Sequence, residues 1–429
     1  MKTDVGTPQL LLLATIVVFG CIRTGPPPPA TAVLPSDANA LDSLYQAHDY
    51  FALRDRLANT KTNLARTAFY TAAVQQAFND PLRSNRTILR ALQAVGVSDS
   101  LRFELMRMQL SNDLRLYEYA HADSVATTIL ATTLSSADSA TLADIRNTDQ
   151  LVRVLRDVPP QRATITGSSL LHTDSAGHIL VQIGDSFRHY GFDTGANLSV
   201  LMRSEAEALG LQIRPVGLTV GSSTDASVKA DIAVAPRLTI GRIAYQNVVF
   251  LVMPDRTLTF GDGFQIRGLI GFPVIEAMDE IHFRRDGSME IPAHASAHSI
   301  HNLALEELRP LVQVNYDGEQ LACLLDTGSG QTRFLAPYYE RHRTSLNASG
   351  APDSMKTGGA GGVRTLSVYR LQHVNLGIGD TTVVLHDVPV YTAFLHQPKD
   401  EQSCAIGLDV LRSFNEYVIN FHSMTLTLH

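Results

Sequence analysis

The sequence predicts a multidomain protein in which an N-terminal all-α segment of helical hairpins precedes two all-β lobes. Three observations support this prediction. Residues before about 158 have helical periodicity. The remainder consists of short β-branched runs separated by Gly, Asp and Asn turns. The triplet Asp-Thr-Gly also occurs twice, at Asp193-Thr194-Gly195 and Asp326-Thr327-Gly328, each time directly after an apolar run. The second part of the chain therefore resembles two copies of one unit.

Composition limits the classes of partner. The 429-residue chain has 35 Lys and Arg residues against 42 Asp and Glu, a net charge of -7. Nucleic acid is not an expected partner, because there is no broad excess of basic residues to neutralise phosphates. The length allows several domains of roughly 100–200 residues each. No motif in the sequence implies a cofactor.

Residues 1–21 are predicted to be a signal peptide. The apolar run from Leu10 to Gly20 is short for a membrane span and suits the core of a signal peptide. It ends at Val18-Phe19-Gly20-Cys21, which resembles the lipobox of bacterial lipoproteins, where the cysteine is lipidated. An ordinary secretory signal or a short membrane anchor is the alternative. The favoured location is outside the inner membrane of a bacterium, as a periplasmic or outer-membrane protein with a lipid anchor on Cys21.

Residues 22–36 are rich in proline and are predicted to be a tether. Residues 37–158 are predicted to form the helical module, with Leu41, Leu44 and Tyr45 on one helix face. Ser84-Asn85 and Ser98-Asp99 are expected to cap helices. The module loosely resembles tetratricopeptide repeats, although no regular repeat of that kind is visible. Its role is either to pack against the following domain as a spacer or to recruit a partner protein.

Residues 162–293 and 297–429 are predicted to be the two lobes. Leu180-Val181-Gln182-Ile183 in the first matches Leu311-Val312-Gln313-Val314 in the second. Further along, an apolar-apolar-Gly motif ends at Gly271 in one copy and at Gly407 in the other. Behind each glycine, apolar residues follow at offsets three, four and seven, which is the spacing of one helix face. Agreement at several separate places indicates an internal duplication.

Together these features resemble the retropepsin-like aspartic peptidase family, with both lobes in one chain. The resemblance covers about residues 162–429. It implies an aspartic endopeptidase acting on peptide or protein substrates, with Asp193 and Asp326 as the catalytic pair that activates a water. It also implies that Gly271 and Gly407 lie in strands behind the two catalytic loops. Since the lobes are tethered, they are expected to pair within one chain, while pairing between two chains remains an alternative.

The residues around the two aspartates fit this chemistry. Gly195 and Gly328 allow a sharp turn where a Cβ would collide. The resemblance implies that Thr194 and Thr327 form hydrogen bonds across a pseudo-twofold axis. Two carboxylates held close together cannot both ionise cheaply, so the pair retains one proton.

The two loops differ at the next position, which is Ala196 in the first and Ser329 in the second. A hydroxyl at that place can donate a hydrogen bond to the carboxylate and favour its ionised form. We therefore expect Asp326 to be the ionised member and Asp193 to carry the shared proton. The alternative explanation is neutral sequence drift at a position that tolerates either alanine or serine.

Two glycine-containing segments, Gly217–Lys229 and Met355–Val363, are candidates for flaps that close over a substrate. Cys323 and Cys404 are predicted to lie side by side, either as a disulfide or as two buried thiols. His294, His298 and His301 have helical spacing, but no carboxylate or cysteine completes a metal site and their segment resembles a linker. No metal site is therefore predicted. The competing function is a non-catalytic peptide-binding or scaffold protein that retains the fold.

Overall fold

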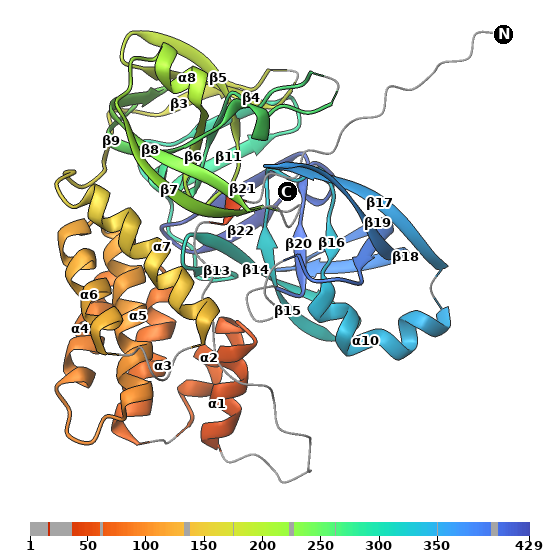
Figure 1. The fold of residues 1–429 in the computed structure, drawn as a ribbon. Coiled ribbons are helices and arrows are strands. Elements are labelled where there is room, and N and C mark those ends of the chain that lie inside the picture. The colour runs from red at the N-terminus through yellow and green to blue at the C-terminus, as the bar shows by residue number, and fades with distance from the viewer. Residues whose placement is uncertain are drawn as a thin grey trace.

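The computed structural model describes residues 16–17, 37–60, 63–132, 138–174, 176–222, 227–261, 263–349, 351–395 and 402–429. Within these ranges a helical region precedes a β-rich region, so the predicted order of all-α and then all-β is confirmed. Figure 1 shows helices on one side of the molecule, against two β lobes. Cys21, the tether and most of the predicted signal peptide lie outside the described residues. Only β1 (Ile16–Val17) is described there, as a short strand beside β7 (Ile213–Ser222).

The helical region ends shortly before residue 158. Its helices are α1 (Asp37–Gln46), α2 (Tyr50–Leu57), α3 (Leu64–Ala77), α4 (Pro81–Leu92), α5 (Asp99–Arg115), α6 (Tyr119–Thr132) and α7 (Ser139–Leu155). Ser98 caps α5 as predicted, with its Oγ accepting from the N–H of Leu101 at 3.3 Å. A tetratricopeptide-like arrangement stays a prediction.

The prediction of a cap at Ser84-Asn85 is wrong. Helix α4 begins one turn earlier, where the carboxylate of Asp80 accepts from the N–H of Arg83 at 3.1 Å. Pro81 favours this start, because proline suits the first helical turn. Ser84 therefore lies inside the helix, is buried, and donates to the carbonyl oxygen of Ala72 at 2.8 Å.

The first lobe is built mainly from antiparallel strands. In addition to β7, they are β2 (Arg162–Ile165), β3 (Ser169–His172), β4 (His178–Ile183), β5 (Ser186–Phe192), β6 (Ser199–Met202), β8 (Val228–Ile240), β9 (Ile243–Met253), β10 (Gly268–Ile270), β11 (Glu280–Arg284) and β12 (Ser288–Ile291). Short helices α8 (Arg203–Ala208), η1 (Asp255–Thr257) and α9 (Phe272–Glu276) connect them.

The second lobe has corresponding elements in the same order. Its strands are β13 (Leu303–Glu306), β14 (Arg309–Tyr316), β15 (Glu319–Leu325), β16 (Arg333–Phe334), β17 (Ala351–Gly359), β18 (Gly362–Ile378), β19 (Thr381–Tyr391), β20 (Cys404–Ile406), β21 (Glu416–Asn420) and β22 (Thr425–Leu428). Its helices are α10 (Ala336–Ser349) and α11 (Leu408–Leu411). In both lobes the hairpin that precedes the Asp-Thr-Gly loop pairs in parallel with a three-residue strand, β5 with β10 and β15 with β20.

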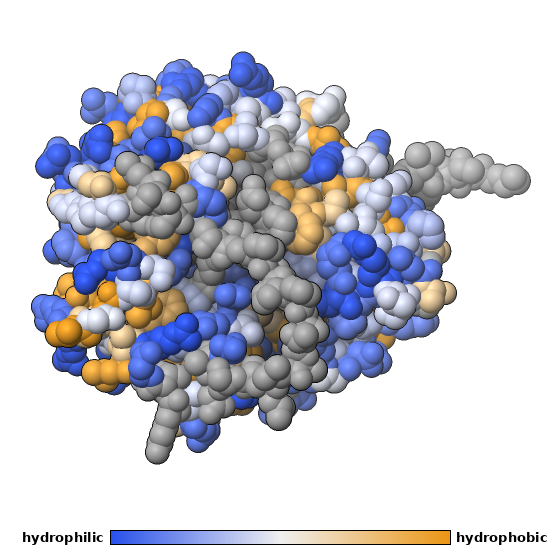
Figure 2. Space-filling view, turned by 60° about the horizontal axis from the view of Figure 1, so that its bottom comes forward, coloured by the Kyte–Doolittle hydropathy of each residue, from blue (hydrophilic) through white to orange (hydrophobic). Residues whose placement is uncertain are grey.

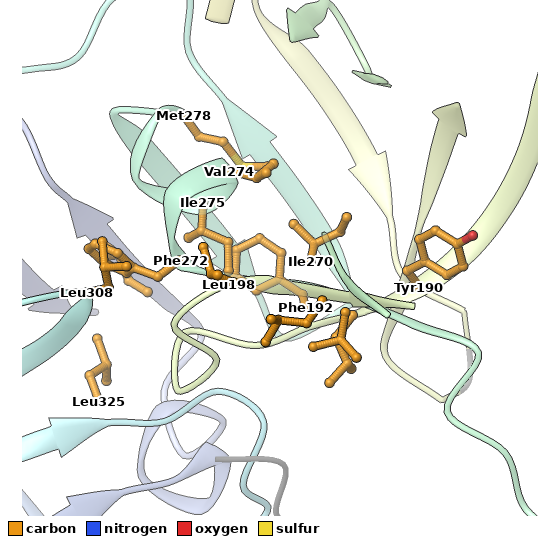
Figure 3. Close-up of a cluster of buried hydrophobic side chains, with 14 of the residues drawn as sticks. Tyr190, Phe192, Leu198, Ile270, Phe272, Val274, Ile275, Met278, Leu308 and Leu325 are labelled. Atoms are coloured by element: carbon orange, nitrogen blue, oxygen red, sulfur yellow. The ribbon is translucent and has the colours of Figure 1, made fainter. Parts of the chain in front are cut away.

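One sheet joins the two lobes. Its strand order is β22-β21-β11-β12-β3, and β11 pairs with β21 in antiparallel register, with Ile281 opposite Ile419. Both isoleucines are fully buried. Figure 3 shows the neighbouring apolar cluster, in which Phe272 and Ile275 of α9 lie beside Phe192, the residue before the first triplet. The strand end that carries the first Asp-Thr-Gly loop is therefore packed in the apolar core.

The helical region shares its hydrophobic core with both lobes. Leu151 and Leu155 of α7 belong to the core of the first lobe. Phe51 of α2 belongs to a cluster that includes Leu311 and Leu324 of the second lobe. Polar contacts add to this, since the buried guanidinium of Arg115 contacts Glu276 Oε1 at 2.8 Å. The helices are therefore a packing partner of the lobes.

The surface is mostly polar, with scattered apolar areas (Figure 2). The exposed large apolar residues of the helical region are Leu64, Leu82, Leu89 and Val95. None of the helices in the described part of the chain is both long and apolar enough to cross a bilayer.

Candidate active site

The two Asp-Thr-Gly loops begin at equivalent strand ends. Asp193 directly follows β5, and its backbone N–H donates to the carbonyl oxygen of Ile270 in β10 at 3.0 Å. Asp326 directly follows β15, and its N–H donates to the carbonyl oxygen of Ile406 in β20, also at 3.0 Å. Each aspartate is therefore fixed by the parallel strand beside it.

Four hydrogen bonds lock the loops to each other. The N–H of Thr194 donates to Thr327 Oγ1, and the N–H of Thr327 donates to Thr194 Oγ1, both at 3.0 Å. Each threonine hydroxyl then donates across to the residue before the opposite aspartate. Thr194 reaches Leu325 O at 2.6 Å, and Thr327 reaches Phe192 O at 3.2 Å. These buried bonds hold the loops in one relative position and have the reciprocal pattern that the resemblance implies.

The glycines of the triplets bring the two carboxylates together. A Cβ placed on Gly195 would lie 2.8 Å from Asp326 Oδ1 and 3.1 Å from Asp193 Oδ1, so one point lies close to an oxygen of each carboxylate. A Cβ on Gly328 would lie 2.5 Å from the carboxyl carbon of Asp193. Only glycine fits at either place. Both aspartates are buried, with exposed fractions of 1% and 0%.

The two backing glycines also occupy tight positions. A Cβ on Gly271 would lie 2.5 Å from the carbonyl oxygen of Leu198, and one on Gly407 would lie 2.6 Å from the carbonyl carbon of Gln331. The N–H of Gly271 donates to Ser199 Oγ at 3.0 Å, and that of Gly407 donates to Thr332 Oγ1 at 2.9 Å. The expectation that these glycines lie in strands is corrected: each directly follows its strand as the N-cap of α9 or α11, and it contacts the loop at backbone distance.

The environments of the two aspartates are electrostatically different. Burial, and next the charge of Asp326, raise the pKa of Asp193 well above its ordinary value. The N–H of Gly195 donates to Asp193 Oδ1 at 2.8 Å and opposes that rise. Asp326 instead contacts a cation, since Arg333 Nη2 lies 2.9 Å from Asp326 Oδ2. Both partners of this ion pair are almost fully buried.

The predicted hydrogen bond from Ser329 to the carboxylate is corrected by these contacts. The Ser329 hydroxyl donates to the carbonyl oxygen of Gln331 at 3.0 Å and accepts from Arg333 Nη1 at 2.7 Å. Its single proton is therefore directed away from Asp326. The polar group that reaches Asp326 is Arg333, which sequence reasoning missed because it lies seven positions after the aspartate, on a different strand. The return of β16 beside the loop brings it there.

The two candidate flaps are β-hairpins where they are described. Strands β17 and β18 pair from Ala351 to Gly359, and their turn reaches the other lobe, where the N–H of Gly361 donates to Thr257 O at 2.9 Å. Strands β7 and β8 form the first-lobe hairpin, whose residues 223–226 lie outside the described part.

Two further sequence interpretations are decided by the fold. Cys323 and Cys404 face each other in register on β15 and β20 and form a disulfide. The helical spacing of the three histidines does not apply, because residues 294–301 contain no helix. His298 instead shares a hydrogen bond with Ser296 Oγ, and His301 with the carbonyl oxygen of Ser423.

Comparison with known proteins gives a family match within the first lobe. Residues 179–274, which include Asp193-Thr194-Gly195 and Gly271, match the family model of an aspartyl protease. A solved structure of a retropepsin-like aspartic protease from Rickettsia conorii matches with 17% identity over 30% of this chain and 91% of that chain, at a TM-score of 0.21. No curated protein matches the sequence.

Proposed function

We propose that this protein is an aspartic endopeptidase that hydrolyses peptide bonds with the pair Asp193 and Asp326. The observation that carries the proposal is the reciprocal set of hydrogen bonds between Thr194 and Thr327, which holds two buried carboxylates around one point. A peptide-binding cleft without catalysis has no need of two acids at one place, because burying them is costly. The match of residues 179–274 to the aspartyl protease family supports the same class.

The chemistry follows from unequal protonation of the pair. An ionised Asp326 accepts a proton from a water held between the carboxylates, and the water oxygen attacks the carbonyl carbon of the peptide bond. Protonated Asp193 donates to the carbonyl oxygen as charge develops on it. Collapse of the tetrahedral intermediate breaks the C–N bond, and the proton taken up by Asp326 passes to the leaving nitrogen. As the new carboxyl group forms, one hydroxyl of the intermediate returns its proton to Asp193, which restores the starting protonation of the pair.

The proposed site assembles within one chain. All four hydrogen bonds of the two threonines join residues of the same polypeptide, and the sheet through β11 and β21 joins the lobes as well. Tethering gives each loop a high effective concentration of its partner. These contacts support the proposal that the pair is completed without a second copy of the chain.

We further propose export across the inner membrane of a bacterium, with removal of residues 1–21 and lipid attachment at Cys21. The support is the sequence Val18-Phe19-Gly20-Cys21 at the end of an apolar run. A disulfide between Cys323 and Cys404 fits an oxidising compartment. The Pro-rich residues 22–36 would hold the folded part away from a periplasmic or outer-membrane surface.

The test is cleavage of a peptide library by the full-length protein, with products identified by mass spectrometry across acidic to neutral pH. Wild type is expected to cut, while Asp193→Asn and Asp326→Asn are each expected to lose activity by at least about 100-fold. The matched control is Asp185→Asn, which changes an exposed aspartate in the turn between β4 and β5.

The competing function is peptide binding without catalysis. It predicts that wild type captures extended peptides and leaves them intact, and that both asparagine variants bind them equally well. Absence of cleavage over the whole pH range, together with such binding, would replace the proposed function by this one.

A further inference from the structure

We propose that Arg333 is a positioning residue that decides which carboxylate of the pair is ionised, and thereby divides the acid and base roles. This inference rests on the proposed function and goes beyond it, because it names the residue that fixes which aspartate takes which role. Its basis is a buried ion pair on one side of the dyad only. Arg333 Nη2 lies 2.9 Å from Asp326 Oδ2.

A second hydrogen bond holds the guanidinium of the ion pair in place. Ser329 Oγ accepts from Arg333 Nη1 at 2.7 Å, so the guanidinium bridges the residue after the triplet and the aspartate within it. The guanidinium is 4% exposed and the carboxylate is 0% exposed. A charge-assisted hydrogen bond that is buried away from solvent is strong, and it keeps Asp326 Oδ2 in contact with the guanidinium. The other oxygen, Oδ1, is the one that lies near Gly195 and the first loop.

The first lobe lacks such a cation at the equivalent place. Ser199 and Thr332 correspond, because each binds the N–H of its backing glycine. The next residue is Val200 in the first lobe and Arg333 in the second, and both are buried. A pseudo-symmetric site therefore carries an apolar side chain on one side and a positive charge on the other. The charge asymmetry is built into β6 and β16.

The two charged groups that act on Asp193 have opposite effects on its pKa. Asp326 raises the pKa of Asp193, and Arg333 lowers it by a smaller amount. Asp409 of α11 is engaged separately, because its carboxylate accepts from the N–H and hydroxyl of Thr332. With the guanidinium on Asp326, the single shared proton resides on Asp193. Asp326 is then the base that accepts the proton of the water.

The first experiment measures the pH profile of kcat/KM for Arg333→Met and Arg333→Lys in the full-length protein. Loss of the positive charge makes Asp326 easier to protonate and makes the doubly ionised pair less favourable. Both limbs of the bell-shaped profile should therefore move to higher pH in Arg333→Met, by about one to three pH units. Arg333→Lys keeps the charge and should keep both limbs near the wild-type positions. A purely structural role would lower kcat in both variants without moving the limbs.

Two comparison variants sharpen this result. Ser329→Ala removes one hydrogen bond of Arg333 but leaves the ion pair, so its limbs should move in the same direction by less. Arg309→Met removes another buried arginine of the second lobe, one that pairs with Glu306, and should leave both limbs in place. Unchanged limbs in Arg333→Met would overturn the proposal.

The second experiment needs neither turnover nor a folded Arg333 variant. Carbon-13 NMR of labelled aspartate carboxyls in the wild-type chain, assigned with Asp193→Asn and Asp326→Asn, shows which carboxyl carries the proton at acidic pH. The proposal expects the proton on Asp193, and a proton on Asp326 would overturn it. If wild type cuts no peptide, the proposed function fails, while this titration still tests whether the carboxyl paired with Arg333 is the ionised one.

Discussion

At the scale of single residues, the active-site loops depend on the absence of side chains as much as on their presence. Gly328 has no space for a methyl group, because its Cβ would lie 2.5 Å from the carboxyl carbon of Asp193. The carboxylate or the loop would have to move. Either movement would break the shared geometry of the pair.

Gly328→Ala should therefore lower kcat/KM by about 100-fold or more, since a displacement of about 1 Å at reacting groups has an effect of that size. It should also destabilise the fold by about 1–3 kcal/mol through overpacking. Peptide cleavage and urea unfolding measure the two effects. Gly261→Ala is the control, because a Cβ at that position meets nothing within 4 Å. Equal losses of kcat/KM and of stability in Gly328→Ala and Gly261→Ala would contradict this explanation.

The protonation of Asp193 links the site to folding. Its pKa is raised by burial and by the charge of Asp326. A carboxyl whose pKa is higher in the folded than in the unfolded chain binds protons more tightly when folded. Its contribution to stability is complete below its unfolded pKa of about 3.9 and is lost as the pH rises towards the raised value.

Asp193→Asn should remove this dependence, because the amide does not titrate. The free energy of unfolding of wild type should fall relative to that of Asp193→Asn as the pH rises above about 4. Urea unfolding of both proteins between acidic and neutral pH measures the difference. Parallel curves over that range would show that Asp193 is not protonated preferentially in the folded state.

At the scale of elements, the helical region contacts the β7–β8 hairpin, the candidate flap of the first lobe, directly. Asn147 of α7 donates to Thr219 O at 2.9 Å and accepts from Thr219 N–H at 2.8 Å, as a neighbouring strand would. A bulge in β7 lies between Arg214 and Leu218, and Gly217 has a positive φ there. The carboxylate of Asp231 accepts from the N–H of Gly217 and holds that bend. Thus α7 restrains the outer edge of the hairpin.

Asn147→Ala should release this edge. The two hydrogen bonds are each worth about 0.5–1.5 kcal/mol, so KM should rise by about fivefold with little change in kcat. Hydrogen exchange of the amides of residues 213–222 should become faster. Asn147→Asp keeps only the acceptor, so its KM and exchange rates should lie between those of wild type and Asn147→Ala. Gln150→Ala, at an exposed position of the same helix, should match wild type in both. Unaltered exchange in Asn147→Ala would refute the restraint.

The disulfide between β15 and β20 joins the strand that precedes Asp326 to the strand that ends before Gly407. Cysteines 81 positions apart close a long loop, so the bond should stabilise the fold by about 2–4 kcal/mol. The double variant Cys323→Ala, Cys404→Ala should lose that amount in urea unfolding. A reductant should destabilise wild type and leave the double variant unaffected. Equal stability of both oxidised proteins would show that the bond adds nothing.

At the scale of the whole molecule, the helices complete the cores of both lobes. Leu155 of α7 packs in the first-lobe core, and Phe51 of α2 shares a cluster with Leu324 beside the second triplet. Asn79 donates to the carbonyl oxygen of Phe421 at 3.1 Å. The helical region thus bridges the two lobes from outside the site.

Deleting residues 37–157 should therefore expose apolar surface on both lobes. We expect the thermal midpoint to fall and the deleted chain to self-associate, as measured by calorimetry and sedimentation. The peptidase activity should also be lower. Deleting only residues 22–36 serves as the control and should leave the thermal midpoint, the association state and the activity unchanged. A deleted chain that stays monomeric with the wild-type midpoint would mean that the helices act only as a spacer.

Much of the site could be predicted from residues close together in the sequence. The two triplets, the backing glycines and the helix after each follow local patterns of turn chemistry and apolar spacing. Residues that act through long-range contacts could not be predicted. Ser329 is adjacent to the second triplet and is the donor that the sequence predicts. Its hydroxyl donates to Gln331 instead, and the group that donates to the Asp326 carboxylate is Arg333.

The order of a helical and a β-rich region and the positions of the two Asp-Thr-Gly loops could be predicted from the amino-acid sequence. The period of the apolar residues, the turn residues and the duplicated motifs are properties of neighbouring residues. Three features came from the folded chain alone: Cys323 and Cys404 form a disulfide and are not two thiols, α7 restrains β7, and Arg333 rather than Ser329 contacts Asp326. These contacts depend on how strands return beside one another, and that is set by packing of the whole core.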